Sequence, residues 1–285
     1  MNQNPKADIE TPSGKGAGDE NFPVGSFLLP RRLRPHVAKY YAFARAIDDI
    51  ADNPGLSPEE KHDRLDGFGE AIMGRSGDQA FQKARALRES MQETNVSFRH
   101  ALDLISAFKQ DAVKSRYKNW DELMDYCDRS ASPVGRYLLE LHGEDKQGFR
   151  YSDALCNALQ VINHVQDCKD DYLQLDRVYI PEGWIVLSGG KINEIDHTEA
   201  TEGVQSAIDK CVAGSRELMK LAHRLPSHLK SRSLAMESQT IINIADKLLD
   251  KLEHEDPVAG RVELTRPQYI GCGIRGVFSV IFGKG

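Results

Sequence analysis

Apolar residues recur at every third or fourth position through most of the chain, from about Pro30 onward. This spacing is typical of helices that bury one face, because an α-helix completes a turn in about 3.6 residues. The alternation of apolar and polar residues that marks strands is absent from the sequence. The most regular stretches cover residues 121–141, 151–175, 203–225 and 229–252. The pattern predicts an all-α protein.

Turn-forming residues divide this pattern into separate helices. Ser57, Pro58 and Glu60 stand in the order of an N-cap, a first-turn proline and a capping-box acid, so a helix is predicted to begin there. Breaks are predicted where Pro and Gly gather, at residues 53–55, 143–148, 181–190 and 224–226. No break is long enough to link two domains. We expect one helical domain over residues 21–285, after a disordered tail at residues 1–20 that is rich in Asn, Pro, Gly and charged side chains.

Composition and charge exclude several classes of function. The 285 residues carry 37 Lys and Arg against 43 Asp and Glu, and this net charge of −6 argues against a general nucleic-acid-binding protein. No apolar run is long enough to predict a membrane-spanning helix. The five cysteines are scattered without a Cys-x-x-Cys pair, and the first residues do not form an apolar leader. We therefore expect reduced thiols in a cytoplasmic protein, with neither disulfides nor a zinc site.

Residues 41–52 are apolar except for their acids and one arginine, which predicts a buried helix. Tyr41, Arg45, Asp48 and Asp52 are spaced i, i+4, i+7 and i+11. On a helix they fall within roughly 60° of one another. One face of a buried helix is thus expected to carry a phenol, a guanidinium and two carboxylates.

Residues 160–171 repeat this arrangement. Gln160, Asn163, Asp167 and Asp171 are spaced i, i+3, i+7 and i+11, and again share one narrow face of a predicted helix. Carboxylates one turn apart repel each other, and burial raises the cost. If the two faces meet, they need cations between them. The ligands offered are all oxygen atoms, which suits Mg²⁺ completed by substrate phosphates and water, and does not suit zinc or copper.

Three other interpretations of these residues remain open at this point. The two stripes could be solvent-exposed acidic faces, or the chain could be a helical scaffold or lipid-binding protein without catalysis. A di-iron carboxylate bundle needs Glu-x-x-His pairs on core helices. Glu59 with His62 and Glu194 with His197 have that spacing, but they stand in polar stretches beside turn signals.

The two acidic segments resemble the motifs of the squalene/phytoene synthase family, and the resemblance extends over residues 21–261. Residues 48–52 resemble the first aspartate-rich motif of the family, and residues 160–181 resemble the second. The segment from Tyr126 to Gly135 is similar to the one whose tyrosine reaches the diphosphate and whose small residues let a helix bend. Residues 22–30 resemble the flap that closes over the phosphates.

This resemblance implies the isoprenoid synthase fold, an all-α bundle around a central apolar cavity, with a prenyl diphosphate and Mg²⁺ at its mouth. It implies the following metal ligands: Asp48, Asp52, Asn163, Asp167 and Asp171. The aspartates and Tyr126 are the implied catalytic residues. Diphosphate binding is implied for Tyr41, Arg45, Gln160, Asn163, Arg177, Tyr179 and Arg261.

Residues 163–172 and 20–24 resemble one branch of the family, the hydroxysqualene synthases of bacterial hopanoid pathways. The implied reaction converts presqualene diphosphate and water to hydroxysqualene and pyrophosphate without NADPH. Gln166 stands where much of the family has arginine, and we expect the loss of this guanidinium to accompany the handling of one diphosphate. The competing interpretation is a condensation of two farnesyl diphosphates to presqualene diphosphate, squalene or a dehydrosqualene.

The chain ends in an apolar, glycine-broken segment at residues 270–282, with Arg275 and Lys284 as its local cations. An apolar triterpene product favours contact of this segment with the inner face of the membrane, and packing onto the rest of the fold is the alternative. The resemblance leaves open a functional coupling to the synthase that supplies presqualene diphosphate.

Overall fold

The structure of the chain is a computed structural model that describes residues 28–283. The predicted tail and residues 22–27 of the predicted flap lie outside this range. Within it the regular elements are helices, apart from one isolated parallel bridge between Arg116 and Val178, so the all-α prediction is confirmed. The helices are α1 (Arg34–Asp52), α2 (Pro58–Met73), α3 (Gln82–Thr94), α4 (Arg99–Asp111), α5 (Trp120–Ser130), α6 (Ser132–Leu141), α7 (Phe149–Gln166), α8 (Cys168–Leu175), α9 (Glu182–Leu187), α10 (Glu202–Ala222), α11 (Arg232–Leu252) and α12 (Arg266–Phe282).

The start of α2 has the predicted capping box. The Glu60 backbone N–H donates to Ser57 Oγ at 3.2 Å, and the Ser57 N–H donates to Glu60 Oε2 at 2.8 Å. Pro58 occupies the first turn, where its missing N–H leaves no helix hydrogen bond unmade. The prediction of a helix beginning here is confirmed.

Two predicted helices are each broken in two. The stretch over residues 121–141 divides into α5 and α6 at Ala131, because Pro133 lacks the N–H that a continuous helix would use. The stretch over residues 151–175 divides into α7 and α8 at Asp167, whose φ of −99° and ψ of 7° leave the helical region. Apolar spacing continues across both breaks, because a bend does not change the period of the buried face. The break predicted at 181–190 was also too long, since it contains α9.

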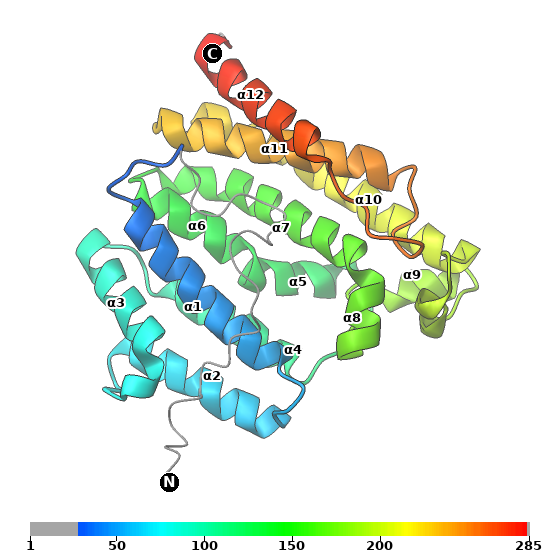
Figure 1. Cartoon of the computed structure of the whole chain (residues 1–285), viewed down its shortest axis with the longest axis horizontal. Helices are drawn as coiled ribbons and strands as arrows, with labels where there is room; N and C mark the ends of the chain where they lie inside the picture. The colour runs from blue at the N-terminus through cyan, green and yellow to red at the C-terminus, as the bar shows by residue number, and fades with distance from the viewer. Residues whose placement is uncertain (1–27, 284–285) are drawn as a thin grey trace.

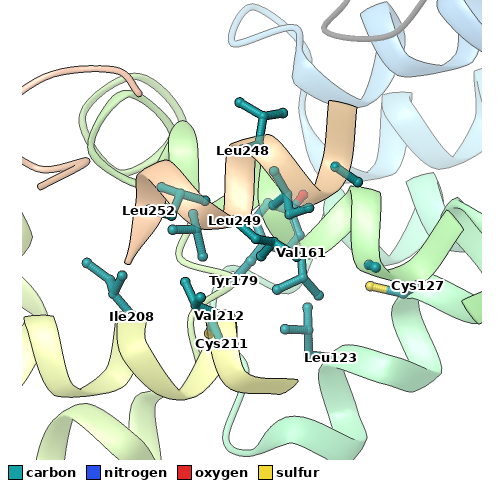
Figure 2. Packing of buried hydrophobic residues seen from close by; sticks show 14 of the residues in the cluster. Leu123, Cys127, Val161, Tyr179, Ile208, Cys211, Val212, Leu248, Leu249 and Leu252 are labelled. Carbon is teal, nitrogen blue, oxygen red and sulfur yellow. The ribbon is translucent and has the colours of Figure 1, made fainter. Parts of the chain in front are cut away.

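The helices form two apolar clusters. The first is built mainly from α5, α7, α10 and α11, and Figure 2 shows Leu123, Val161, Val212 and Leu249 meeting at its centre. The second is built from α1 to α4 and α6. In Figure 1, α1, α6 and α7 occupy the middle of the molecule, with α2 and α3 on one side and α10 to α12 on the other. Side chains of both clusters line the cavity described below.

Helix α12 packs on the outer side of α11 (Figure 1). A Cβ atom on Gly276 would lie 2.5 Å from Thr240 Oγ1 and 2.8 Å from Thr240 Cα, so glycine is needed where the two helices touch. Asn243 Nδ2 of α11 donates to the Cys272 carbonyl at 3.2 Å. The alternative that the apolar C-terminal segment packs onto the fold is therefore confirmed for one face of α12. Among residues 28–283, no helix has both the length and the apolar character that crossing a membrane requires.

Candidate active site

An elongated cavity of about 490 Å³ lies along α1 and α7. On α1 its lining runs from Val37 to Asp52, a rise of roughly 22 Å along the helix axis. On α7 it runs from Ser152 to the break at Asp167. Along both helices the lining residues change from apolar at the N-terminal end to polar at the C-terminal end. The cavity therefore has an apolar end and a polar end.

The first acidic face lies on α1 as predicted. Tyr41, Arg45, Asp48 and Asp52 all line the cavity. Arg45 Nη1 lies 2.9 Å from Asp48 Oδ2, and Arg45 Nη2 donates to Asp49 Oδ1 at 2.7 Å. Arg45 is thus held by the acids three and four residues after it, which fixes its guanidinium beside the cavity wall.

The second acidic face also lies on the cavity wall, although the helix that carries it is broken. Gln160 and Asn163 are on α7, Asp167 stands at the break, and Asp171 is on α8. The Asp171 N–H donates to the Asp167 carbonyl at 2.8 Å, which keeps the helical spacing across the break. The prediction that these side chains share one side is therefore confirmed, and the prediction of one continuous helix was wrong.

The two acidic faces meet at the polar end of the cavity. Asp176 has a positive φ of 47° and ends α8, so the chain turns and Arg177 points back toward α1. Arg177 Nη1 donates to Asp52 Oδ1 at 2.8 Å. Asp52 of the first face also lies near enough to Asp171 of the second to raise its pKa. Residues more than a hundred positions apart in the sequence therefore form one site.

Asp111, at the end of α4, connects this site and was not predicted from the sequence. It is buried, and its carboxylate accepts hydrogen bonds from Tyr126 Oη at 2.6 Å and from Tyr179 Oη at 3.1 Å. Arg177 Nη2 donates to the Asp111 backbone carbonyl at 3.1 Å. The sequence does hold a signal, because Asp111 follows Leu104 and Phe108 at helical spacing and so places an acid on an apolar face.

Burial makes several of these carboxyl groups hard to ionise. It raises the pKa of Asp48 to about 8, with a further contribution from Asp52, while Arg45 lowers it. Burial and the neighbouring Asp167 raise the pKa of Asp171 to about 7. Burial raises the pKa of Asp111 to about 6 against the opposing effect of Arg177. The polar end therefore has more acid than its own cations neutralise.

His164 is a neutral group in the cavity wall. Its ring stacks on Tyr179 with centroids 3.5 Å apart, and Gln160 Nε2 lies 3.0 Å from its Nε2. Burial, followed by the charge of Arg177, lowers the pKa of His164 to about 3. His164 therefore packs and forms a hydrogen bond in the cavity wall.

Arg261 is the one predicted site residue that does not line the cavity within the described part of the chain. Its Nη2 instead lies 3.1 Å from Asp167 Oδ1. Gln166 directly precedes Asp167, and its buried side chain donates to the Val262 carbonyl. Gln166 therefore holds the segment that carries Arg261. The expected link between the missing guanidinium and the handling of one diphosphate stays a prediction.

The polar end has the donor set of a site for a hard cation. Five aspartates but only two arginines line the cavity in residues 28–283, and Asn163 adds an amide. Carboxylate and amide oxygens are ligands that Mg²⁺ accepts. No group of three or more His, Cys, Asp and Glu side chains in this range is arranged so that it could hold a metal ion. What fits a hard cation is the type of donor that lines the polar end.

The Glu-x-x-His pairs of the di-iron interpretation lie apart from this cavity. His62 Nε2 is 2.9 Å from the Lys109 carbonyl, and Glu194 accepts a hydrogen bond from Thr201 at 2.6 Å. Neither pair lines the cavity. The five cysteines are all free thiols, as expected.

A squalene/phytoene synthase family model matches residues 16–268. The chain belongs to this family. It is 39% identical over 256 residues to a hydroxysqualene synthase of Sinorhizobium fredii, covering 90% of this chain and 87% of that protein. It is 37% identical to a hydroxysqualene synthase of Zymomonas mobilis, covering 91% of this chain and 87% of that one.

A solved structure supports the same relationship. The crystal structure of squalene synthase HpnC from Alicyclobacillus acidocaldarius superposes with a TM-score of 0.71 at 34% identity, covering 81% of this chain and 86% of that chain. The chain is thus an isoprenoid synthase that acts on prenyl diphosphates, with the predicted helical fold. This finding decides against the non-catalytic scaffold and against the di-iron bundle.

Proposed function

We propose that this family member converts presqualene diphosphate and water to hydroxysqualene and pyrophosphate in a Mg²⁺-dependent reaction. The observation that supports this choice of reaction is the set of relatives at 36–39% identity over most of the chain that are named hydroxysqualene synthase. The long apolar wall suits a thirty-carbon substrate, and the acidic end suits a diphosphate bound with cations. The substrate, the cation and the roles of the site residues all belong to this proposal.

The proposed roles follow from where the side chains lie. Asp48, Asp52, Asn163, Asp167 and Asp171 would hold Mg²⁺ through oxygen atoms, and bound Mg²⁺ would supply positive charge for the departing pyrophosphate. Tyr41, Arg45, Gln160 and Arg177 would donate hydrogen bonds to diphosphate oxygens, and Tyr179 would do so once its hydroxyl turns from Asp111 to the anion. Arg45 and Arg177 are already fixed by acids, so little ordering is needed when the anion binds.

Ionisation breaks the carbon–oxygen bond to the diphosphate, and the electron pair leaves with pyrophosphate. The apolar wall excludes bulk water from the resulting carbocation. The carbocation then rearranges with opening of the cyclopropane ring, one water forms a carbon–oxygen bond to the rearranged cation, and the proton of that water passes to the released pyrophosphate. The reaction needs no hydride donor, because it changes no overall oxidation state, and we therefore expect no requirement for NADPH.

Two tyrosines lie beside the Arg177 guanidinium at the polar end of the cavity. Tyr126 and Tyr179 meet at Asp111, where their hydroxyl oxygens lie 3.4 Å apart. Because Asp111 accepts from both, it holds the two phenols next to the Arg177 guanidinium. We assign Tyr126 to the leaving-group side of the cavity, and Arg261 to holding Asp167 in place.

The test incubates the purified chain and Mg²⁺ with presqualene diphosphate or with farnesyl diphosphate, each with and without NADPH, and identifies products by gas chromatography and mass spectrometry. Hydroxysqualene from presqualene diphosphate, unchanged by NADPH and lost with a chelator, is the expected result. Conversion of farnesyl diphosphate to a thirty-carbon product would support the condensing reaction in its place. Asp171→Asn is the matched site variant, and it should release little pyrophosphate from either substrate.

A further inference from the structure

Helix α12 has an apolar face that nothing in the described chain covers. Ile270, Ile274, Phe278 and Phe282 expose between 56% and 72% of their surface. They follow one another at intervals of four, so they form a stripe that turns through roughly 120° along the helix. Ile281 adds a further exposed side chain to this stripe. Folding therefore leaves large apolar residues in solvent over four turns of one helix.

This stripe lies on the side of α12 that faces away from the protein. The buried residues of α12, Cys272 and Gly276, are the ones that contact α11. Gly276 and Ile274 point in nearly opposite directions around the helix, about 160° apart. Since α12 is the outermost helix on this side of the molecule (Figure 1), the stripe faces outward.

The charges of α12 favour a lipid surface with anionic headgroups over a second protein. The helix contains Arg266 and Arg275 and no Asp or Glu, in a chain whose net charge is −6. Both arginines are exposed, and neither makes an ion pair with another described residue. Phe278 and Phe282 stack at the C-terminal end of the stripe, with ring centroids 5.5 Å apart. An apolar stripe with cations at its border is the pattern of a helix that lies in a membrane interface.

The position of α12 relative to the cavity also favours a lipid surface as its partner. Helix α11 contacts α12 through Thr240 and Asn243, and lines the cavity through Leu234, Ser238 and Ile241. One helix thus separates the exposed stripe from the apolar end of the cavity. Substrates and products of this family have long isoprenoid chains that partition into lipid.

We propose that α12 docks the protein on an anionic bilayer through Ile270, Ile274, Phe278, Ile281 and Phe282, with Arg266 and Arg275 contacting the lipid headgroups. The helix lies in the plane of the interface and does not cross it. This places the apolar end of the cavity next to the lipid phase. The inference concerns one surface of the molecule and does not depend on which prenyl diphosphate the site converts.

Sedimentation with vesicles tests this inference on the full chain. Wild type should bind vesicles of equal phosphatidylglycerol and phosphatidylcholine. The triple variant Ile274→Ser, Phe278→Ser, Phe282→Ser should lower the partition coefficient by about tenfold or more, because binding scales with buried apolar area. Val186→Ser with Leu187→Ser on α9 is the matched control, since these residues are exposed apolar side chains on another helix. It should bind as wild type does.

A second variant addresses the charge and protects against loss of folding. Arg275→Glu leaves the apolar stripe unchanged, and should weaken binding to the anionic vesicles by roughly fivefold or more. It should have a smaller effect on vesicles of phosphatidylcholine alone. Circular dichroism checks that each variant is folded. If the triple variant is not folded, vesicle binding by the Arg275→Glu variant tests the proposal.

Two outcomes would overturn the proposal. One is wild type that stays in the supernatant with both kinds of vesicle. The other is a wild-type dimer in analytical ultracentrifugation that the stripe variants dissociate while vesicle binding is unchanged, because the stripe would then contact a second copy of the chain.

Discussion

Asp111 holds three side chains that come from two separate segments of the chain. Tyr126 comes from α5, and Arg177 and Tyr179 come from the segment after α8, yet all of them contact this one residue. A hydrogen bond to a buried charged group contributes about 1.5–3 kcal/mol. Asp111 therefore contributes to stability and to the position of two proposed diphosphate ligands at the same time.

We predict that Asp111→Asn lowers the turnover of the diphosphate substrate by about tenfold to a hundredfold and the free energy of unfolding by about 1–3 kcal/mol. The amide keeps one of the two acceptor oxygens that the phenols of Tyr126 and Tyr179 use, and it has no charge to hold Arg177. Steady-state kinetics and urea denaturation measure the two effects. Asp103→Asn is the matched control, because Asp103 is also a buried acid of α4 but pairs with Arg99 away from the cavity. Equal losses of activity in both variants would contradict the prediction.

Most helices of this fold could be predicted from the spacing of apolar residues, and the family resemblance of residues 126–135 implied the bend at Ala131, but the break at Asp167 could not be predicted. A helix that bends keeps its buried face, so the sequence period continues through both breaks. The residues on the two acidic faces could be predicted, since helical spacing alone places them together. Helical spacing marks Asp111 as an acid on an apolar face, but its role could not be predicted, because that role depends on contacts with α5 and with the segment after α8 that no local pattern records.

At the scale of the element, the contact between α11 and α12 rests on Gly276. We predict that Gly276→Ala lowers the free energy of unfolding by about 1–3 kcal/mol, because its Cβ would meet the Thr240 backbone and the helices would have to separate. Gly271→Ala on the same helix is the control, since no atom lies within 4 Å of its Cβ position. It should be neutral or stabilising by about 1 kcal/mol, because alanine favours helix. Thermal and urea denaturation of both variants measure these effects. A Gly276→Ala variant with an unchanged free energy of unfolding would contradict the prediction.

At the scale of the whole molecule, the concentration of acid at one end of the cavity makes stability depend on pH. Asp48 and Asp171 have pKa values raised to about 8 and about 7 in the folded protein, whereas an unfolded aspartate has a pKa of about 3.9. Between these values the folded state binds more protons than the unfolded state. Stability is therefore highest below about pH 4 as far as these groups are concerned, and it is lost as pH rises toward 8.

We predict that the metal-free protein loses unfolding free energy between pH 5 and pH 8, and that Mg²⁺ raises the melting temperature more at pH 8 than at pH 5, because it binds the ionised carboxylates. Asp48→Asn with Asp171→Asn should flatten the pH dependence and remove most of the Mg²⁺ effect. Differential scanning calorimetry across this range measures both. A Mg²⁺ effect of the same size at both pH values, or a pH slope unchanged in the double variant, would count against the proposed cation site.

Residues of both apolar clusters line the cavity, so an isoprenoid chain that binds there extends the apolar interior of the protein. An isoprenoid chain in that space would touch Val37, Leu155 and Leu234 much as a core side chain does. In each catalytic cycle, an isoprenoid chain that packs against the hydrophobic core enters the cavity and leaves it again. Amide hydrogens of α1, α7 and α11 should therefore exchange more slowly with solvent when an isoprenoid chain occupies the cavity.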